Sequence, residues 1–295
     1  MMPSLLSESS YTSSREAVLS DRDFDRLSEF IHTECGIKMP PSKKIMLQAR
    51  LQKRLRKLSM TSMSEYCSYL FSPAGIENEL IHMIDVVTTN KTDFFREPKH
   101  FDYMVQKALP ELMAGKGVGI RHKLTVWSAG CSTGEEPYTL AMLLKDFADQ
   151  YPGFNFDFLI LATDISTRAL EIAKRAIYDN EKVAPVPPEM KKRYLLRGKN
   201  DKKGYVRIVP ELRDVVRFRR LNFLEGTYGM SEPMDIIFCR NVIIYFDRAT
   251  QEKLMNRFAR QLSPGGYIFI GHSETLHGLN VPLVQVAPTV YRNPV

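Results

Sequence analysis

The sequence predicts an α/β fold behind a small all-helical domain, because strand and helix patterns alternate from residue 124 onward. Apolar strands are expected at 124–128 and 157–163, and each leads into a helix, at 135–149 and 166–177. Such alternation is typical of a mainly parallel sheet with right-handed crossovers. Small and acidic residues also follow these strands, at the sheet edge where open α/β folds hold a nucleoside. We therefore expect a Rossmann-like sheet.

The first ninety residues carry helical patterns only. Ser20 is a suitable start for a helix whose apolar face includes Phe24 and Ile31 and which ends at Gly36. Further helices are expected at 42–58, 64–71 and 76–88. The polar, serine-rich residues 1–15 are expected to be disordered.

The remaining chain continues the α/β rhythm with one interruption. A connecting helix is expected at 97–113, broken by Pro110. The stretch from about 190 to 221 has strand character without a long helix, which predicts a small antiparallel insertion. The sheet resumes at 234–239, followed by a helix at 247–262 and a strand at 267–270. The predicted divisions are a tail at 1–15, a helical domain at 16–92, and an α/β domain at 93–295 with a β-subdomain inserted at about 190–221.

The turn that follows the first strand indicates the kind of ligand. Ala129 and Gly130 allow the backbone to approach a ligand closely, and the second strand ends in Asp164, which suits ribose hydroxyls. The turn lacks a G-x-G-x-x-G motif, and Glu135 and Glu136 stand where a pyrophosphate would need bare helix-terminal N–H groups. Carboxylates there favour a cationic ligand such as S-adenosylmethionine. The pattern therefore predicts a methyltransferase.

Composition narrows the class of protein further. No apolar run approaches the length of a membrane span and no secretion signal is evident, so we expect a cytoplasmic protein without direct membrane insertion. The four cysteines lie far apart, without disulfide or zinc-ligand spacing, and the six histidines are scattered, so no metal site is predicted. Cys131, within the ligand turn, is interpreted as an inert small residue.

The net charge of +7 favours an anionic partner, and the basic residues are concentrated in one predicted helix. Seven cations and no acid lie between Ser42 and Leu58. Arg50, Lys53, Arg54 and Lys57 follow helical spacing and form one stripe beside a leucine stripe. A solvated helix face is the alternative, although solvated faces usually mix charges of both signs.

Five segments together resemble CheR, the chemotaxis receptor methyltransferase family, in order and spacing. They are Asn90-Lys-Thr-Asp-Phe-Phe-Arg-Glu97, Trp127-Ser-Ala-Gly-Cys-Ser-Thr-Gly-Glu-Glu-Pro-Tyr138, Ala162-Thr-Asp-Ile165, Ile237-Phe-Cys-Arg-Asn-Val-Ile-Ile-Tyr-Phe246 and Gly271-His-Ser-Glu274. The resemblance implies an N-terminal helical domain, a class I methyltransferase sheet and an inserted β-subdomain. It also implies O-methylation of glutamates on the cytoplasmic helices of chemoreceptors, with S-adenosylmethionine as cofactor and S-adenosylhomocysteine as product.

The same resemblance implies the site residues. Those carried over to the cofactor site are Asn90, Thr92, Arg96, Glu136, Asp164, Asn222, Arg240 and Asn241. The adjoining positions Ala129, Gly130, Glu135, Ile165 and Phe223 complete the predicted cofactor site. Arg96 and Tyr245 carry over as the catalytic residues nearest the transferred methyl group.

The chemistry agrees with a carboxylate substrate. A glutamate has an ordinary pKa of about 4.3 and is ionised at neutral pH, so it needs no general base. Arg96 suits bidentate binding of that carboxylate, and Tyr245 suits a hydrogen bond or contact with the sulfonium. Each has a structural alternative: an ion pair near Glu97 for Arg96, an ordinary strand-end aromatic for Tyr245. Asp164 has one too, as the cap of the following helix.

Partners follow from the charge pattern. The acidic helices of a chemoreceptor are the expected partner of the basic stripe, which is taken as Arg50, Lys53, Arg54, Arg56 and Lys57, and the protein is expected at membrane-bound receptor arrays. A receptor C-terminal peptide that adds a strand to the β-subdomain is left open.

Two other functions fit the sequence less well. A nucleic-acid methyltransferase is disfavoured because the strand end at 240–245 lacks the prolines of amino-adenine enzymes and the basic helix lacks aromatics for base stacking. No nucleic-acid partner is therefore expected. A non-catalytic cofactor-binding module is disfavoured because Arg96, Asp164, Asn241 and Tyr245 are all present.

Overall fold

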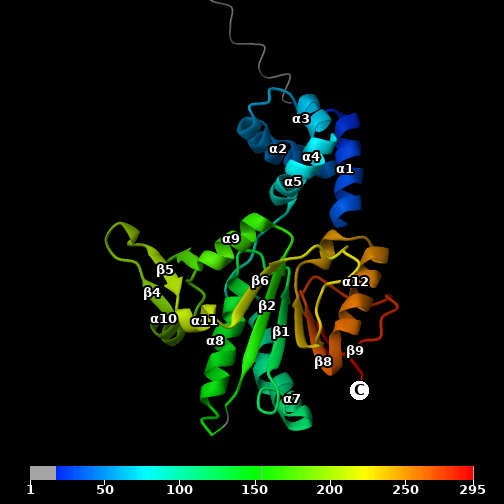
Figure 1. Ribbon diagram of the computed structural model, residues 1–295. Coiled ribbons are helices and arrows are strands. Elements are labelled where there is room, and N and C mark those ends of the chain that lie inside the picture. Colours follow the sequence, from blue (N-terminus) through cyan, green and yellow to red (C-terminus); the bar gives the residue numbers. More distant parts are fainter. Residues whose placement is uncertain (1–17, 154, 295) are drawn as a thin grey trace, which may run out of the picture. The chain divides into compact units, whose positions relative to one another are not determined.

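The computed structural model describes residues 18–153 and 155–294, so the predicted disordered tail at 1–15 lies outside the described residues. The chain divides into two compact units, Met1–Thr89 and Asn90–Val295 (Figure 1). In the described residues, no helix has both the length and the apolar character that a membrane crossing requires.

The first unit is built from helices only. Its elements are α1 (Asp21–Cys35), the 3₁₀ turn η1 (Pro41–Lys43), α2 (Lys44–Leu58), α3 (Met63–Leu70), α4 (Pro73–Asn78) and α5 (Leu80–Val87). As predicted, Ser20 caps α1, with its hydroxyl accepting the Asp23 N–H, and Gly36 ends the helix in the left-handed region. The apolar faces of α1 and α2 are buried, including Ile31, Leu47 and Leu51.

A helical segment that contains Pro110 lies near the start of the second unit. It comprises α6 (Pro98–Tyr103), the wide π-type turn η2 (Met104–Ala108) and α7 (Leu109–Lys116). Pro110 lies in the first turn of α7, where a missing N–H leaves no bond unmade. The π-type turn η2 before it accommodates the proline, so the helix does not break at Pro110 as predicted but continues from η2 into α7.

A seven-stranded sheet forms the centre of the second unit, in the order β6-β2-β1-β7-β8-β10-β9. The strands are β1 (Leu124–Ala129), β2 (Phe158–Asp164), β6 (Val216–Arg220), β7 (Met234–Cys239), β8 (Leu262–Ile270), β9 (Val284–Ala287) and β10 (Val290–Arg292). The first five strands in this order, from β6 to β8, are parallel. The strand β10 pairs antiparallel with both β8 and β9. This is the predicted Rossmann-like class I methyltransferase sheet.

Alternating side chains of the central strands enter two different cores. Val126 of β1 packs in one core with α8 (Glu135–Asp149), while its neighbour Trp127 packs in the other with α12 (Arg248–Gln261). The sheet is therefore buried on both faces between helical layers, as parallel sheets are. The helix α9 (Thr167–Arg175) follows β2 and packs near β6.

The small β-subdomain lies earlier in the chain than predicted. Its antiparallel strands are β3 (Ile177–Asp179), β4 (Leu195–Arg197) and β5 (Tyr205–Ile208), in the order β3-β5-β4. The predicted range of 190–221 was wrong at both ends, because β3 follows α9 directly and 216–220 forms β6 of the main sheet. Strand character alone does not reveal which partner a strand will pair with.

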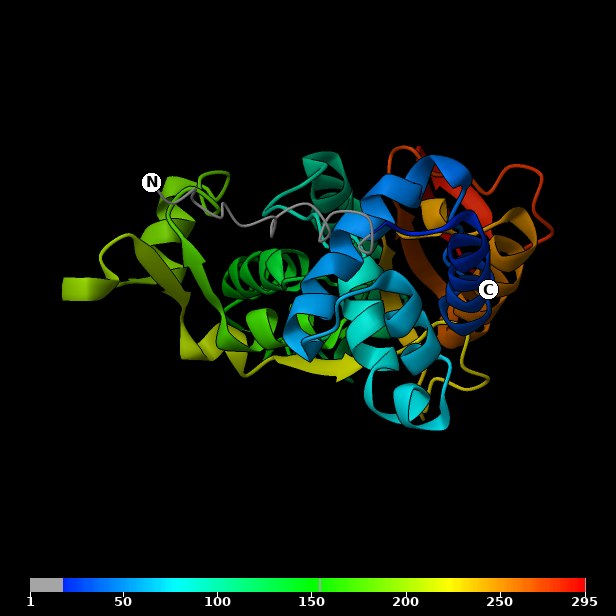
Figure 2. The same cartoon turned by 90° about the horizontal axis from the view of Figure 1, so that it is seen from above.

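Short elements complete the insertion and the loops beside it. In and after the insertion these are α10 (Pro188–Tyr194), η3 (Asn200–Lys202) and α11 (Pro210–Arg213), whereas η4 (Ile243–Tyr245) follows β7. Within the second unit, the small sheet and the C-terminal strands lie at opposite sides (Figure 2).

Candidate active site at the carboxyl ends of the central strands

The strand order reverses between β1 and β7. From β1 the chain proceeds to β2 and β6 on one side, and β7 and β8 lie on the other. Open α/β sheets bind their ligands outside the carboxyl ends of the strands at such a switch point. The residues after β1, β2 and β7 therefore define the candidate site.

The turn after β1 requires glycine at one position. Gly130 has a φ of 87°, and a Cβ there would lie 2.5 Å from Cγ2 of Val242, in the loop after β7. The N–H groups of Gly130 and Cys131 donate to the carbonyl of Thr163 at 2.8 and 2.9 Å. Gly130 thus lets the loops that follow β1 and β7 approach each other at the switch point.

Cys131 is buried in this turn, and burial raises the pKa of its thiol well above the ordinary value. A thiol held neutral in this way suits the predicted inert role.

Asp164 ends β2 with its carboxylate fixed by backbone donors. Its Oδ2 accepts the Ser132 N–H at 2.8 Å, and its Oδ1 accepts the Ser166 N–H at 2.9 Å. The side chain that caps α9 is Ser166, whose hydroxyl accepts the Ala169 N–H. The capping alternative for Asp164 is therefore not needed, and its carboxylate stands at the ligand edge.

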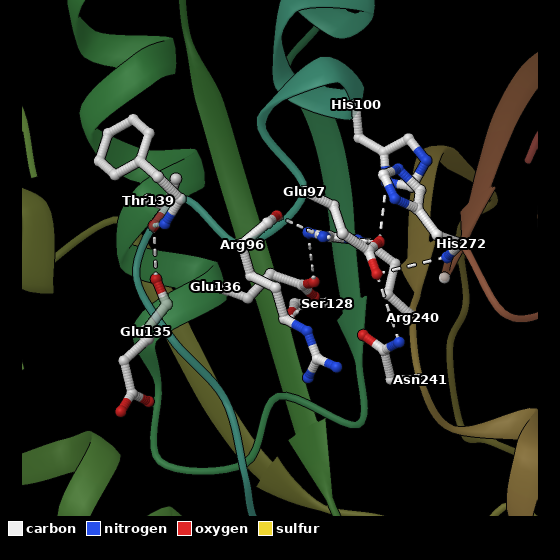
Figure 3. Close-up of polar contacts among 12 residues, drawn as sticks. Arg96, Glu97, His100, Ser128, Glu135, Glu136, Thr139, Arg240, Asn241 and His272 are labelled. Atoms are coloured by element: carbon white, nitrogen blue, oxygen red, sulfur yellow. Dashed lines mark hydrogen bonds and ion pairs between the residues drawn. The ribbon is translucent and has the colours of Figure 1, made fainter. Parts of the chain in front are cut away.

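The segment from Asn90 to Glu97 is tied to this edge at several points. The Asn90 carbonyl accepts the Ser132 hydroxyl at 3.0 Å, and the Phe95 N–H donates to Thr139 of α8 at 3.2 Å. The Arg96 carbonyl accepts a hydrogen bond from the Arg240 guanidinium (Figure 3). These bonds hold the segment against the turn after β1, α8 and the end of β7.

Arg240 lies between two carboxylates. Its side chain is 2% exposed and forms ion pairs with Glu97 at 3.0 Å and with Glu136 at 3.2 Å. The guanidinium carbon also lies 5.2 Å from the centre of the Phe101 ring. The buried charge is thus paired on both sides, as a buried cation requires. The predicted cofactor residue Arg240 makes these contacts within the protein.

The environments of the two carboxylates shift their pKa values in opposite directions. Burial raises the pKa of Glu136, against the opposing effects of Arg240 and of the Ser128 hydroxyl bond at 2.7 Å. Burial also acts to raise the pKa of Glu97, but Arg240 and its hydrogen bonds outweigh it and hold that pKa below the ordinary value.

Glu135 and Glu136 have different surroundings. Glu135 is 1% exposed, accepts the Thr133 hydroxyl at 2.7 Å and pairs with Lys182 at 3.3 Å. Lys182 also pairs with Asp93 and donates to the carbonyl of the predicted cofactor residue Thr92. Figure 3 shows Glu135 and Glu136 on different sides of the first turn of α8. Glu136 is therefore the acid that faces the switch point.

The loop after β7 is clamped by one buried carboxylate. Glu274 accepts the N–H groups of Gly271 at 2.6 Å, Val242 at 2.8 Å, Asn241 at 2.9 Å and Ile244 at 3.3 Å. Asn241 has a φ of 58°, and this clamp holds it there. Glu274 therefore fixes the loop that carries Asn241 and, in η4, the predicted catalytic Tyr245.

The remaining predicted residues have partly structural surroundings. Ala129 is buried, and the Ile165 carbonyl accepts the Arg220 side chain at 3.2 Å. Asn222 accepts the Leu224 N–H at 3.1 Å, and Phe223 packs edge-on against Trp127 and Phe258. The Arg96 side chain donates to the Lys91 carbonyl at 3.2 Å, and the residue is half-buried.

The basic stripe of the first unit is not uniformly exposed. Lys53, Arg56 and Lys57 are exposed on α2. Arg54 is 7% exposed and forms a buried pair with Glu79, and Arg50 donates to the carbonyls of Val87 and Thr88 at the end of α5. Arg54 is therefore not available to a partner, and the Arg50 guanidinium is already bonded to backbone carbonyls of its own unit.

Sequence reasoning missed several residues that build the site. Glu97, Ser128 and Glu274 stand inside quoted motifs but received no role in the cofactor site, and nothing in the sequence indicated Lys182. A signal was present for Glu274, since an acid within the Gly271–Glu274 turn suits unpaired backbone N–H groups. His100 and His272, 172 positions apart in the numbering, carried no local signal.

Comparisons with known proteins agree with this geometry. The model of the CheR methyltransferase SAM binding domain matches residues 90–291, and that of the CheR methyltransferase all-alpha domain matches residues 22–88. The chain belongs to the CheR methyltransferase family.

Relatives extend over nearly the whole chain. The chemotaxis protein methyltransferase of Borreliella burgdorferi is 37% identical over 270 residues, covering 92% of this chain and 93% of that protein. The chemotaxis protein methyltransferase of Escherichia coli K12 is 39% identical over 273 residues, covering 92% and 91%. Chemotaxis protein methyltransferase 2 of Pseudomonas aeruginosa is 38% identical over 270 residues, covering 91% and 92%.

The cofactor of this family domain is S-adenosylmethionine, and the donor set of the switch point fits it. The buried carboxylate of Asp164 ends β2 and the half-buried carboxylate of Glu136 lies in the first turn of α8, where they would hold ribose hydroxyls and a cationic group. The Gly130 turn supplies the close backbone approach. The family model and the relatives confirm the predicted methyltransferase class and its cofactor.

Proposed function

We propose that this protein methylates glutamate side chains on the cytoplasmic helices of chemoreceptors, giving glutamate methyl esters during chemotaxis. The names of the relatives, chemotaxis protein methyltransferases, support the process. The choice of glutamate rests on one contrast within the site, between the two arginines Arg96 and Arg240.

Of these two arginines, Arg96 is the one whose guanidinium is available to bind a substrate. In the described part of the chain no carboxylate lies within ion-pair distance of it, and its guanidinium donates to the Lys91 carbonyl alone. Arg240 beside it is saturated by two carboxylates. A structural ion pair between Arg96 and Glu97 is therefore disfavoured, because the Glu97 carboxylate is already paired with Arg240. A guanidinium at the site edge suits a substrate carboxylate, which it binds bidentately.

The proposed reaction needs positioning more than proton transfer. The bound cofactor supplies an electrophilic methyl group on a sulfonium. A glutamate carboxylate is ionised at neutral pH, so the chain need only orient it and remove its water. Such positioning contributes on the order of 7–11 kcal/mol to lowering a barrier. In this proposal Arg96 orients the carboxylate, and Tyr245, held in η4 by the Glu274 clamp, contacts the reacting group.

The cofactor residues retain their proposed roles with one refinement. Asp164 would accept ribose hydroxyls, and Glu136 would face the cationic end of the ligand, with Asn90, Thr92, Asn222 and Asn241 around them. Arg240 would act by holding Glu97 and Glu136 in place rather than by direct contact.

A labelling experiment tests the substrate class. Tag-free protein is incubated with a receptor cytoplasmic fragment and labelled cofactor, with RNA as the competing substrate. We expect base-labile mass on receptor glutamates, located by mass spectrometry, and none on RNA. Label on lysine or on RNA would contradict the proposal.

Substitutions of Arg96 test its proposed role in orienting the substrate carboxylate. Arg96→Lys keeps the charge but loses the planar fork, so we expect a kcat at least about 10-fold lower, with a larger loss for Arg96→Ala. Binding of S-adenosylhomocysteine, measured by calorimetry, separates loss of cofactor from loss of substrate orientation. Arg260→Ala, an exposed arginine on α12, is the matched control.

The proposed receptor surface is the exposed part of α2, formed by Lys53, Arg56 and Lys57 and bordered by Arg50. Charge complementarity with acidic receptor helices supports it, and it would place the protein at membrane-bound receptor arrays in the cytoplasm. A receptor C-terminal peptide at an edge of the β3-β5-β4 sheet remains a separate prediction, tested by titrating such a peptide against the protein.

A further inference from the structure

Three side chains from distant parts of the sequence converge beside Arg240. Glu97 precedes α6, His100 lies within it, and His272 follows β8. Each offers one ligand atom, and these atoms all lie within 4.8 Å of one another. Figure 3 shows both imidazole rings next to the Glu97 carboxylate. The backbone N–H of His272 also donates to Oε1 of Glu97 at 3.3 Å.

The tautomer of His100 follows from its hydrogen bonds. Its Nε2 lies 2.7 Å from the hydroxyl oxygen of Thr289, and that hydroxyl donates its own proton to the Pro288 carbonyl at 2.7 Å. With the hydroxyl proton assigned to the Pro288 carbonyl, the Thr289 oxygen accepts and the proton of His100 is assigned to Nε2. This leaves a lone pair on Nδ1 of His100.

That lone pair faces another acceptor. His100 is 2% exposed, and its buried Nδ1 has no hydrogen-bond partner. The nearest carboxylate oxygen, Oε2 of Glu97, lies 3.5 Å away. Arg240 already pairs with this Glu97 oxygen at 3.0 Å, so Nδ1 of His100 is the buried atom of the two that lacks a partner, and buried polar atoms are otherwise partnered.

A buried histidine whose ring nitrogen lacks a partner has that nitrogen available as a metal ligand. Neutral imidazole is the form that binds metals. The Nε2–H bond to Thr289 is the kind of outer contact that orients histidine ligands.

We propose that Glu97, His100 and His272 form a binding site for a divalent transition metal, with Zn²⁺ the ion that the donor set fits best. Two nitrogens and one carboxylate oxygen are typical zinc ligands, and they leave one position open. Bonds of about 2.0–2.1 Å require the ligand atoms to move closer together. The exposed His272 can supply this movement and gives the ion access from solvent.

The neighbouring charges are compatible with a cation. Arg240 is matched by Glu97 and Glu136, so the cluster of two carboxylates and one guanidinium is net negative when both acids are ionised. Arg240 would remain an outer partner that orients the Glu97 carboxylate. The ion would fasten the Asn90–Glu97 segment to the end of β8, which makes its role structural.

Zinc binding to the whole, tag-free protein tests the site. After treatment with a chelator, ZnCl₂ is titrated by calorimetry, and CoCl₂ is followed by its visible absorption. We expect one equivalent to bind, with the cobalt spectrum of a four-coordinate site. His272→Ala should weaken zinc binding by about 10-fold or more. The matched control is His277→Ala, an exposed histidine five positions away, which should bind zinc as the native protein does.

Two further measurements keep the result unambiguous. His272 is exposed, so its replacement should leave the fold intact, which S-adenosylhomocysteine binding and circular dichroism verify. Glu97→Gln should also weaken zinc binding. Failure of the native protein to bind zinc or cobalt would overturn the proposal, and so would equal zinc affinity in the native protein and His272→Ala. Either outcome would leave the proposed methyltransferase function untouched.

Discussion

Arg54 and Glu79 form a bidentate ion pair inside the helical unit. The Arg54 Nε lies 2.7 Å from Oε1 of Glu79, and Nη2 lies 2.5 Å from Oε2. Tyr66 donates its hydroxyl to the same carboxylate at 3.0 Å. Both charged side chains are nearly inaccessible to solvent, at 8% and 1% exposure. The pair connects α2 to the residue that precedes α5, and its first consequence concerns stability.

Removing one partner of this pair should destabilise the protein strongly. Arg54→Met leaves the Glu79 carboxylate buried without its counter-ion, so we expect a loss of about 3–5 kcal/mol in the free energy of unfolding. Arg54→Met with Glu79→Leu removes both charges and should recover most of that loss. Urea denaturation measures both, with Lys53→Met, on the exposed face of α2, as the control. If Arg54→Met and Lys53→Met were equally stable, Arg54 would not be needed to neutralise the buried Glu79 carboxylate.

This pair shows what the sequence leaves undetermined in the helical unit. Arg54 and Lys57 share a basic stripe, and helical spacing places them on neighbouring faces. Which of them is buried depends on Glu79, 25 positions away, and no periodicity reveals that partner. The helices themselves were predictable, because Ser20 and Gly36 mark the ends of α1 through local backbone chemistry.

The methyltransferase unit was more predictable because its signals are local. Small residues after β1, the acid after β2 and the acids that open α8 lie within single strand-turn-helix steps. The β-subdomain was misplaced because Val216–Arg220 has the same alternation whether it pairs with β2 or with another strand. Glu97, Glu274 and His272 escaped notice because their roles depend on tertiary contacts.

The turn after β1 should not tolerate a side chain at Gly130. Gly130→Ala would place a Cβ 2.5 Å from Val242 Cγ2, at a φ of 87° that alanine disfavours. We expect a loss of about 1–3 kcal/mol in stability together with weaker binding of S-adenosylhomocysteine. Gly130→Ala combined with Val242→Ala relieves the clash but not the backbone strain, so it should recover part of the affinity. Calorimetric affinities that do not differ between the single and double variants would argue against the contact.

Asp164 should contribute to cofactor affinity through its charge. Asp164→Asn keeps the shape but replaces one acceptor oxygen by a donor, which opposes the N–H of either Ser132 or Ser166. Loss of a hydrogen bond to a charged group costs about 1.5–3 kcal/mol, or about 10- to 150-fold in Kd for S-adenosylhomocysteine. Asp157→Asn, at the exposed residue just before the same strand, is the control. Unchanged affinity in Asp164→Asn would show that the ribose is bound elsewhere.

Glu135 should make stability fall as pH rises. Burial raises the pKa of Glu135, with Thr133 and Lys182 opposing that shift. Because the folded-state pKa lies above the unfolded value of about 4.3, the folded protein binds the proton more tightly. Its contribution is fully present below pH ~4.3 and is lost as pH rises through the folded pKa. Glu135→Gln removes this dependence, so the native protein should lose more stability than the variant between pH ~4 and 7. Parallel pH profiles from urea denaturation would contradict this.

Receptor methylation should depend on the exposed face of α2 and on salt. Replacing Lys53, Arg56 and Lys57 by alanine removes three exposed cations but leaves the Arg54–Glu79 pair intact. We expect kcat/KM for a receptor fragment to fall about 10-fold or more at low ionic strength, and less at high salt, where such attraction is screened. Binding of S-adenosylhomocysteine should not change. The matched control replaces Lys174, Lys253 and Arg260, which are equally exposed but lie on α9 and α12. If both triple variants lose the same activity, net charge rather than α2 directs recognition, and the proposed surface is wrong.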